Sequence, residues 1–230
     1  MNYPLCLAAM VGALSSSLSA ATIAWTDSAY TNTGTNENTL GIDQFDQSGT
    51  LEYAINLGGA AFTFNNAVEP DIDFAASDAD FDASALTGTA AVFYNNNNGN
   101  NQLANTAIYA GGGEKTITMN NLTIGQDYRL QILIMDGRAA ANGAYATFDS
   151  HTTGSFANGV SGVTWGDSLL VTGTFTADST SQSFQHRSFY SPSSPSGGQM
   201  NGVLLYSVPE PSSTALLGLA GVALLVRRRR

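Results

Sequence analysis

Short segments in which apolar and polar residues alternate, each ended by a turn signal, fill the middle of this chain. Residues 51–57 alternate at period two and stop at Gly58-Gly59. A period of two is typical of a strand with one buried face, and a glycine pair interrupts such a strand. The same reasoning predicts strands at residues 60–64, 89–94, 115–119, 128–135, 168–176, 182–190 and 202–208.

About nine or ten strands without a convincing helix predict an all-β chain. The arrangement that suits so many short strands is a two-sheet antiparallel sandwich, and we expect a jelly roll. The strands at 168–176 and 182–190 are separated only by residues 177–181, so we expect them to pair as an antiparallel hairpin. The sandwich is expected to form one domain over residues 22–207.

The composition favours a folded extracellular domain and argues against nucleic-acid binding. Of the 230 residues, 43% are hydrophobic and only 11% are charged, which does not fit intrinsic disorder. The last four residues of the chain are four of its eight basic residues. The rest of the chain therefore has four basic and 18 acidic residues, which gives it a formal net charge of −14. Such a surface repels phosphate backbones, whereas it suits divalent cations, neutral glycans or simple solubility.

Residues 1–21 have the layout of a secretory signal peptide with its signal helix. An apolar run over residues 4–14 is followed by small residues, with Ser19 and Ala21 at positions −3 and −1 of a cleavage site. The expected partners are the Sec translocon and a signal peptidase. Cys6, the only cysteine, lies in this segment, so the mature domain is expected to hold no disulfide. An ordinary core strand or helix is the alternative.

The C-terminal residues 208–230 combine a proline-rich motif, a short apolar segment and a basic end. The motif consists of Val208, Pro209, Glu210 and Pro211. Its prolines end the last strand because proline donates no backbone hydrogen bond. The apolar residues 212–226 predict a short transmembrane helix that spans a thinned bilayer. The positive-inside rule keeps the terminal cluster in the cytoplasm, which places the domain outside; the cluster consists of Arg227, Arg228, Arg229 and Arg230.

This order of motif, apolar helix and arginine stop resembles the PEP-CTERM sorting tag of Gram-negative bacteria, which is also named after ice-binding proteins that carry it. The resemblance implies that an exosortase cleaves the exported chain near residues 209–211. It also implies a transient inner-membrane anchor, followed by a place at the cell surface or outside the cell. A generic stop-transfer anchor is the alternative.

A looser resemblance covers about residues 110–207. Residues 121–131 place a Leu-Thr-x-Gly-x-x-Tyr turn before a strand, which is similar to galactose-binding-like jelly rolls of extracellular bacterial proteins. The other segments that carry this resemblance are 136–138, 173–178 and 201–205. It implies the jelly-roll fold. Many such domains bind sugars, and others have lost that activity.

The densest acidic stretch suggests a calcium site. Asp78, Asp80 and Asp82 alternate, and several oxygen ligands on a curved chain suit a hard cation. The EF-hand pattern is not met, because Ala83 and Thr89 stand at its sixth and twelfth positions. The alternative is a solvated acidic loop or strand face, with the apolar neighbours Ile72, Phe74 and Phe81 pointing inward. Apart from Ca²⁺, no cofactor is expected.

A sugar site is a second possibility. Asp136 and Arg138 follow the best strand, near Arg129, and could bond sugar hydroxyls; a structural salt bridge is the alternative. Trp165, in a glycine-rich stretch, is the best candidate to stack on a sugar ring, although a loop tryptophan also covers core ends. The other aromatic candidates are Trp25, Tyr94, Tyr109 and Tyr190.

No catalytic motif is found. His151 and His186 are the only histidines, without a metal-binding spacing, and His186 is expected at the surface or half-buried. The Gly-x-Ser-x-Gly elbow of serine hydrolases is absent, and no carboxylate pair is singled out for a glycosidase.

The sequence therefore predicts a signal peptide, one β-sandwich and a sorting anchor. The leading hypothesis is a non-enzymatic structural or adhesive surface protein associated with exopolysaccharide. A carbohydrate-binding module and a polysaccharide-acting enzyme are the alternatives.

Overall fold

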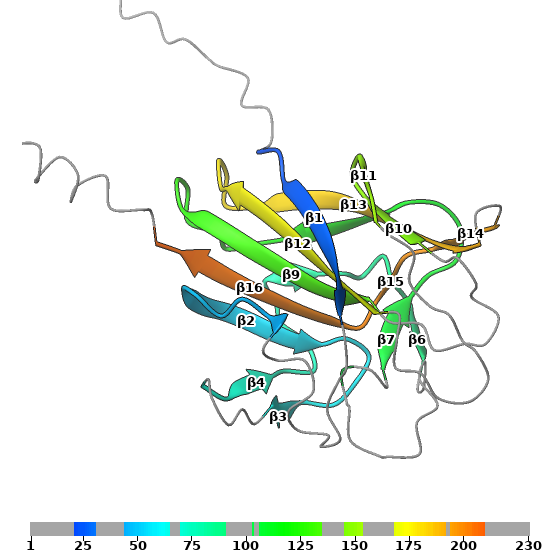
Figure 1. Ribbon diagram of the computed structural model, residues 1–230, viewed down its shortest axis with the longest axis horizontal. Coiled ribbons are helices and arrows are strands. Elements are labelled where there is room, and N and C mark those ends of the chain that lie inside the picture. Colours follow the sequence, from blue (N-terminus) through cyan, green and yellow to red (C-terminus); the bar gives the residue numbers. More distant parts are fainter. Residues whose placement is uncertain are drawn as a thin grey trace, which may run out of the picture.

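The computed structural model describes residues 21–30, 44–64, 70–90, 103, 106–134, 145–153, 168–191 and 194–209. This part of the chain consists of strands and loops without a regular helix (Figure 1). The predicted all-β class is therefore confirmed. The predicted signal helix and the predicted membrane helix fall on residues outside this part.

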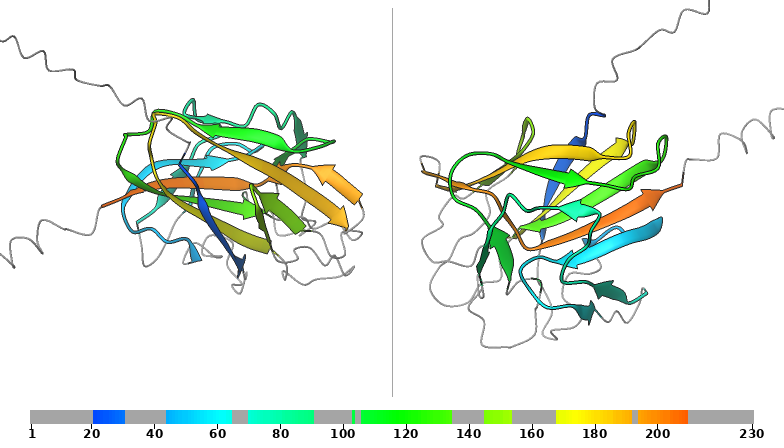
Figure 2. Two further views of the ribbon diagram at one scale, coloured as in Figure 1. Left: turned by 90° about the horizontal axis from the view of Figure 1, so that it is seen from above. Right: turned by 180° about the vertical axis from the view of Figure 1, so that it is seen from behind.

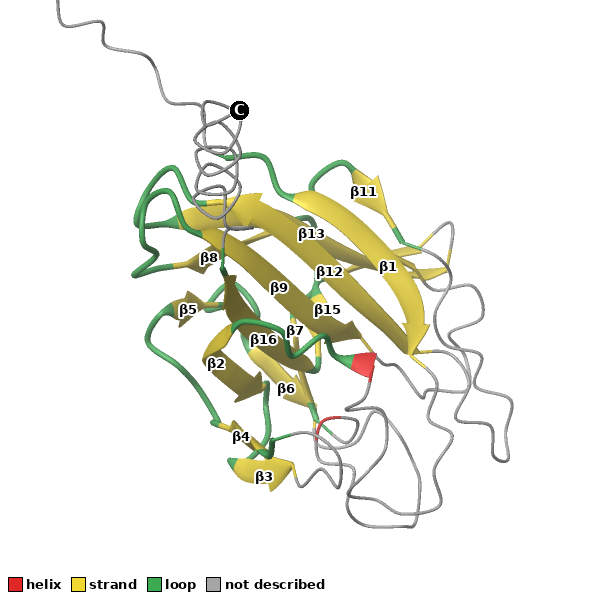
Figure 3. Cartoon of the chain, turned by 60° about the vertical axis from the view of Figure 1, so that its left-hand side comes forward, coloured by secondary structure: helices red, strands yellow, loops and turns green. Residues whose placement is uncertain are grey.

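The first sheet has the strand order β1-β12-β9-β16-β2, and all neighbours are antiparallel. Figure 3 shows these five strands side by side. Their bounds are Ala24–Tyr30 for β1, Thr50–Asn56 for β2, Asp127–Ile134 for β9, Ser168–Thr176 for β12 and Gly202–Val208 for β16.

The second sheet has the order β11-β10-β13-β8-β5, with β14 also paired to β13. It lies over the first sheet as the other layer of a sandwich (Figure 2). Its bounds are Phe81–Asp82 for β5, Lys115–Met119 for β8, Tyr145–Phe148 for β10, His151–Thr152 for β11, Gln182–Ser191 for β13 and Ser194–Gly197 for β14.

Two small sheets complete the described part. One joins β6 (Gly88–Ala90), β7 (Ala107–Tyr109) and β15 (Gln199–Met200). The other is the pair β3 (Phe62–Phe64) and β4 (Ile72–Phe74).

The main core lies between the two large sheets. Alternate residues of each strand point into it, as a sandwich requires. From the first sheet come Leu130, Ile132 and Val171, and from the second come Ile117 and Phe184, all buried.

A second apolar cluster covers the opposite face of the first sheet. Leu133 of β9 and Leu204 of β16 belong to this cluster, together with Phe45, Phe64 and the β4 residues Ile72 and Phe74. Strand β9 is therefore covered on both faces, and every residue from Tyr128 to Ile134 is buried. This double burial explains why residues 128–135 carry apolar side chains on both faces rather than on one.

The predicted hairpin of residues 168–176 and 182–190 is wrong. Strand β12 pairs with β1 and β9 in the first sheet, whereas β13 pairs with β8 and β10 in the second. Residues 177–181 cross between the sheets, a gap of about 10 Å that five residues span easily. Ala177 fixes the start of this crossing by bonding its N–H to Gln126 O and its carbonyl to Gly125 N. The alternation of apolar and polar residues identifies each strand, but it does not show which other strand that strand pairs with.

The predicted surface position of His186 is also wrong, because its ring is fully buried. Nδ1 lies 3.2 Å from Thr147 O, and Nε2 lies 3.0 Å from both the N and the O of Gln199. The ring also stacks on Phe148 with centroids 4.5 Å apart. Burial lowers the pKa of His186 to about 4, so the ring is neutral in the folded protein.

Lowering the pH from 7 to about 4 should destabilise the fold through His186. The unfolded side chain takes up a proton below its ordinary pKa of 6.5, whereas the folded one stays neutral down to about 4. The stabilisation is therefore complete above pH 6.5 and is lost as the pH falls through this window. Urea unfolding across this range should show a loss of about 3 kcal/mol that the variant His186→Gln lacks.

The control is Thr116→Ala, a change at an exposed and non-titrating position of the neighbouring strand β8, which should keep the wild-type pH dependence. Equal pH dependence in wild type and His186→Gln would contradict the assignment.

Candidate functional site

The last described strand leads directly into the predicted sorting motif. Strand β16 lies between β9 and β2, and Val208 is still in register with Asp127. Val208 O accepts a hydrogen bond of 2.7 Å from Gln126 Nε2. Pro209, the next residue, is exposed and has no N–H with which to continue the ladder. The motif thus begins at the end of a central strand, while Glu210 and Pro211 lie outside the described residues.

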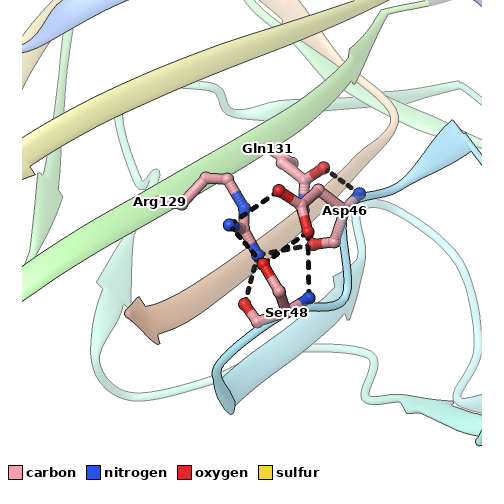
Figure 4. Close-up of polar contacts among 4 residues, drawn as sticks. All are labelled: Asp46, Ser48, Arg129 and Gln131. Carbon is pink, nitrogen blue, oxygen red and sulfur yellow. Dashed lines mark hydrogen bonds and ion pairs between the residues drawn. The ribbon is translucent and has the colours of Figure 1, made fainter. Parts of the chain in front are cut away.

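Next to this strand, Arg129 fastens residues 45–48 onto the outer side of the first sheet (Figure 4). Its side chain is 9% exposed, and its Nη1 lies 2.8 Å from Asp46 Oδ2. Nη2 donates to Asp46 O at 2.7 Å and also to Ser48 O. Gln131 adds two bonds to Asp46, accepting from its N at 2.8 Å and donating to its O at 2.9 Å. We call Arg129, Gln131, Asp46 and Ser48 the Arg129 clasp.

The electrostatics of the Arg129 clasp favour its charged form. Burial alone would raise the pKa of Asp46, but hydrogen bonds from Ser48 and the charge of Arg129 together hold it below its usual range. Arg129 also lies over the Tyr206 ring, 5.4 Å from its centroid. Both terminal nitrogens of Arg129 are bonded within the clasp, whereas its Nε is buried without a partner among the described residues, and these contacts hold residues 45–48 in place. Arg129 therefore forms a salt bridge, and its partner is Asp46.

The three aspartates of the predicted calcium site act in local turns. Asp78 Oδ1 accepts from Asp80 N at 2.8 Å, and Asp82 Oδ1 accepts from Ser84 N at 2.9 Å. Asp80 Oδ2 accepts from Asn121 Nδ2 at 3.3 Å. In the described part of the chain, no three His, Cys, Asp or Glu residues gather as metal ligands would. The expected inward direction of Ile72, Phe74 and Phe81 is confirmed, since all three are buried.

The residues expected to bind sugar are not brought together in the part that the structure describes. Trp165, Asp136 and Arg138 lie outside it, as do Tyr94 and the arginines 227–230. Trp25 covers one end of the core, since its ring lies 5.2 Å from that of Phe184, edge to face. Its Nε1 donates to Asp149 Oδ2 at 2.9 Å. Nearby, His151 Nε2 lies 2.8 Å from Asp27 Oδ1, which joins β11 to β1.

The structure reveals an aromatic cluster that sequence reasoning missed. Tyr145 of β10 and Phe189 of β13 are directly opposite each other, and their rings stack with centroids 4.4 Å apart. The guanidinium of Arg187 lies 4.9 Å from the Phe189 centroid on the same face. All three side chains are half-buried, so part of each reaches solvent. Arg187 and Phe189 lie two residues apart on β13, and the register between β10 and β13 brings Tyr145 to them.

Polar residues extend this face across the second sheet. The outward-pointing neighbours on β13, β8 and β10 are exposed or half-buried; they are Thr116, Thr118, Thr147, Ser183 and Gln185. Together with Tyr145, Arg187 and Phe189, they form what we call the outer face of the second sheet. It is mainly polar, and its side chains offer hydrogen-bond donors and acceptors.

Comparison with known proteins identifies one segment. The family model described as the PEP-CTERM protein-sorting motif matches residues 207–230. No curated protein and no solved structure matches the chain. The motif is a tag of secreted, membrane-transiting proteins of Gram-negative bacteria and implies export through an exosortase-type system. Among the described residues, no helix has the length and apolar character to cross a bilayer.

Replacing Arg129 with Met should lower the free energy of unfolding by about 2–4 kcal/mol, because two backbone carbonyls and Asp46 lose a buried donor. The control is Arg187→Met, the same change at a half-buried arginine, which should cost less than about 1 kcal/mol. Equilibrium unfolding in urea measures both. Equal losses for the two variants would show that the Arg129 clasp does not hold residues 45–48.

Proposed function

We propose that this chain is a non-enzymatic structural or adhesive protein of the cell surface or extracellular matrix, delivered through the exosortase-type system that its PEP-CTERM motif implies. In this proposal residues 1–21 are a signal peptide, and residues 212–226 anchor the chain in the inner membrane until it is cleaved. The arginines 227–230 stay in the cytoplasm. The exported cargo is the β-sandwich of residues 22–207, for which we propose a jelly-roll topology.

The observation that carries this proposal is the position of the sorting motif. The sheet register ends at Val208, and Pro209 is already exposed. Cleavage after this point would therefore remove the tag without removing any strand of the first sheet. A domain that keeps its whole core after processing is suited to be the cargo of a sorting system.

The use of the polar residues supports a structural role. Arg129 and Gln131 hold residues 45–48, and His186 ties β13 to β10 and β15. The aspartates 78, 80 and 82 accept hydrogen bonds from loop residues. Each of these groups is engaged in holding the fold together, as expected for a scaffold.

A carbohydrate-binding module is the second candidate. The observation that favours it is the outer face of the second sheet, where Tyr145, Phe189 and Arg187 reach solvent beside hydroxyl and amide side chains. Trp165, Asp136 and Arg138 stay candidates for a loop site, and calcium at Asp78, Asp80 and Asp82 stays a prediction. A polysaccharide-acting enzyme is the third candidate; turnover of a matrix glycan that is abolished by changing one carboxylate would favour it.

Changing the sorting motif should block release of the protein. The variant Glu210→Ala should accumulate in the inner-membrane fraction with its C-terminal segment attached, because the exosortase no longer recognises the motif. Cell fractionation and the intact mass of the surface protein measure this. The matched control Glu114→Ala, at an exposed loop position, should be released as in wild type. Normal release of Glu210→Ala would contradict processing at this motif.

A further inference from the structure

The outer face of the second sheet presents hydrogen-bonding groups that are already ordered. Gln185 Nε2 donates to Thr116 Oγ1 at 2.9 Å, across the pair β13 and β8. On the same two strands, the hydroxyls of Thr118 and Ser183 are 2.9 Å apart. Each hydroxyl still has bonding capacity for a ligand, because it offers one donor and two acceptors. Ordered groups lose little conformational freedom on binding.

Arg187 gives this face a directional donor. Its guanidinium is held against the Phe189 ring, and it forms no ion pair with a carboxylate of the described residues. Its Nε is buried, so the terminal nitrogens are the ones that could donate to two adjacent hydroxyls at once. The rings of Tyr145 and Phe189 beside it supply apolar surface for the C–H groups of a sugar ring.

The negative net charge of the chain favours a neutral polymer over a polyanion as the ligand. Four basic and 18 acidic residues precede the terminal arginines, so a polyanion meets net repulsion. The outer face itself carries Arg187; Asp82 flanks it where β5 pairs with Thr118, and Asp149 lies beside Gln185, whose N–H it accepts at 2.8 Å. Its other side chains are neutral donors and acceptors. A neutral polyol chain matches these groups without electrostatic cost.

We propose that the outer face of the second sheet binds a neutral polysaccharide, with Arg187, Tyr145 and Phe189 holding one end of the chain segment and Gln185, Thr116, Thr118 and Ser183 bonding along it. This inference rests on the second candidate function and names its ligand class and its site.

The test uses the full chain in mild detergent and pairs of soluble polymers that share a backbone. Hydroxyethyl cellulose is paired with carboxymethyl cellulose, and dextran with dextran sulfate, in affinity electrophoresis and calorimetry. At least one neutral polymer should bind, and its charged partner should bind more weakly. Because no charges are paired, the affinity should change less than about twofold between 0.05 and 0.5 M NaCl.

Variants locate the site. Arg187→Met and Tyr145→Ala should each weaken binding about tenfold or more, and Thr116→Ala should weaken it measurably. Thr26→Ala, an exposed threonine on β1 of the other sheet, is the matched control for Thr116→Ala and should bind as wild type. Thermal unfolding of each variant verifies that the fold is kept.

Each outcome decides between distinct conclusions. If only the charged polymers bind, or if a second copy of the chain binds instead, the proposal that the ligand is a neutral polysaccharide is contradicted. Unchanged neutral binding in Arg187→Met and Tyr145→Ala overturns the site but leaves the carbohydrate-binding function. No binding to any polymer overturns both, while surface delivery is judged separately by the release of Glu210→Ala.

Discussion

The whole described structure depends on burying strand β9 from both sides. Alternate residues from Tyr128 to Ile134 point apolar side chains into the main core. The residues between them point to the opposite face; they are Leu133 and the polar Arg129 and Gln131. One neighbouring sheet can cover only one of these faces. The second face is therefore covered by residues 45–48 and by the pair β3 and β4, which bring Phe45, Phe64 and Phe74.

Polar groups inside this double layer are satisfied by backbone atoms from distant segments. Arg129 and Gln131 bind the backbone of residues 46–48, and His186 binds that of Thr147 and Gln199. Asn56, which is fully buried, donates to Ala60 O and accepts from Thr106 Oγ1. Apart from the bond of Asn56 to Ala60, these bonds join residues at least 13 positions apart in the sequence. The sandwich thus gains its specificity from a few buried polar groups, because an unpaired one would cost about 1–3 kcal/mol.

The sequence predicts the local features of this molecule well and the nonlocal ones poorly. The bounds of β8, β12 and β16 agree with the predicted strands, and the sorting motif, a contiguous signal, was identified from its residues alone. Period-two alternation shows which side of a strand is buried, but it carries no information on the neighbouring strand. The hairpin of β12 and β13 was therefore predicted wrongly.

The same limit applies to the candidate sites. His186 was expected near the surface because its partners, Thr147 and Gln199, belong to strands that only the fold brings to it. The stack of Tyr145 on Phe189 depends on a strand register between residues 44 positions apart. Residues 45–48 show no periodic pattern from which the Arg129 clasp could be predicted. The sequence therefore pointed to the loop residues Trp165, Asp136 and Arg138 as sugar ligands and not to the outer face of the second sheet.

The central place of β16 also limits the order in which the strands of the first sheet can pair. Strands β9 and β2 lie on either side of it, and both leave the ribosome before it, yet neither can complete its ladder without it. Because β16 is the last described strand before the sorting motif, this side of the sheet cannot close until residues 202–208 are available to it.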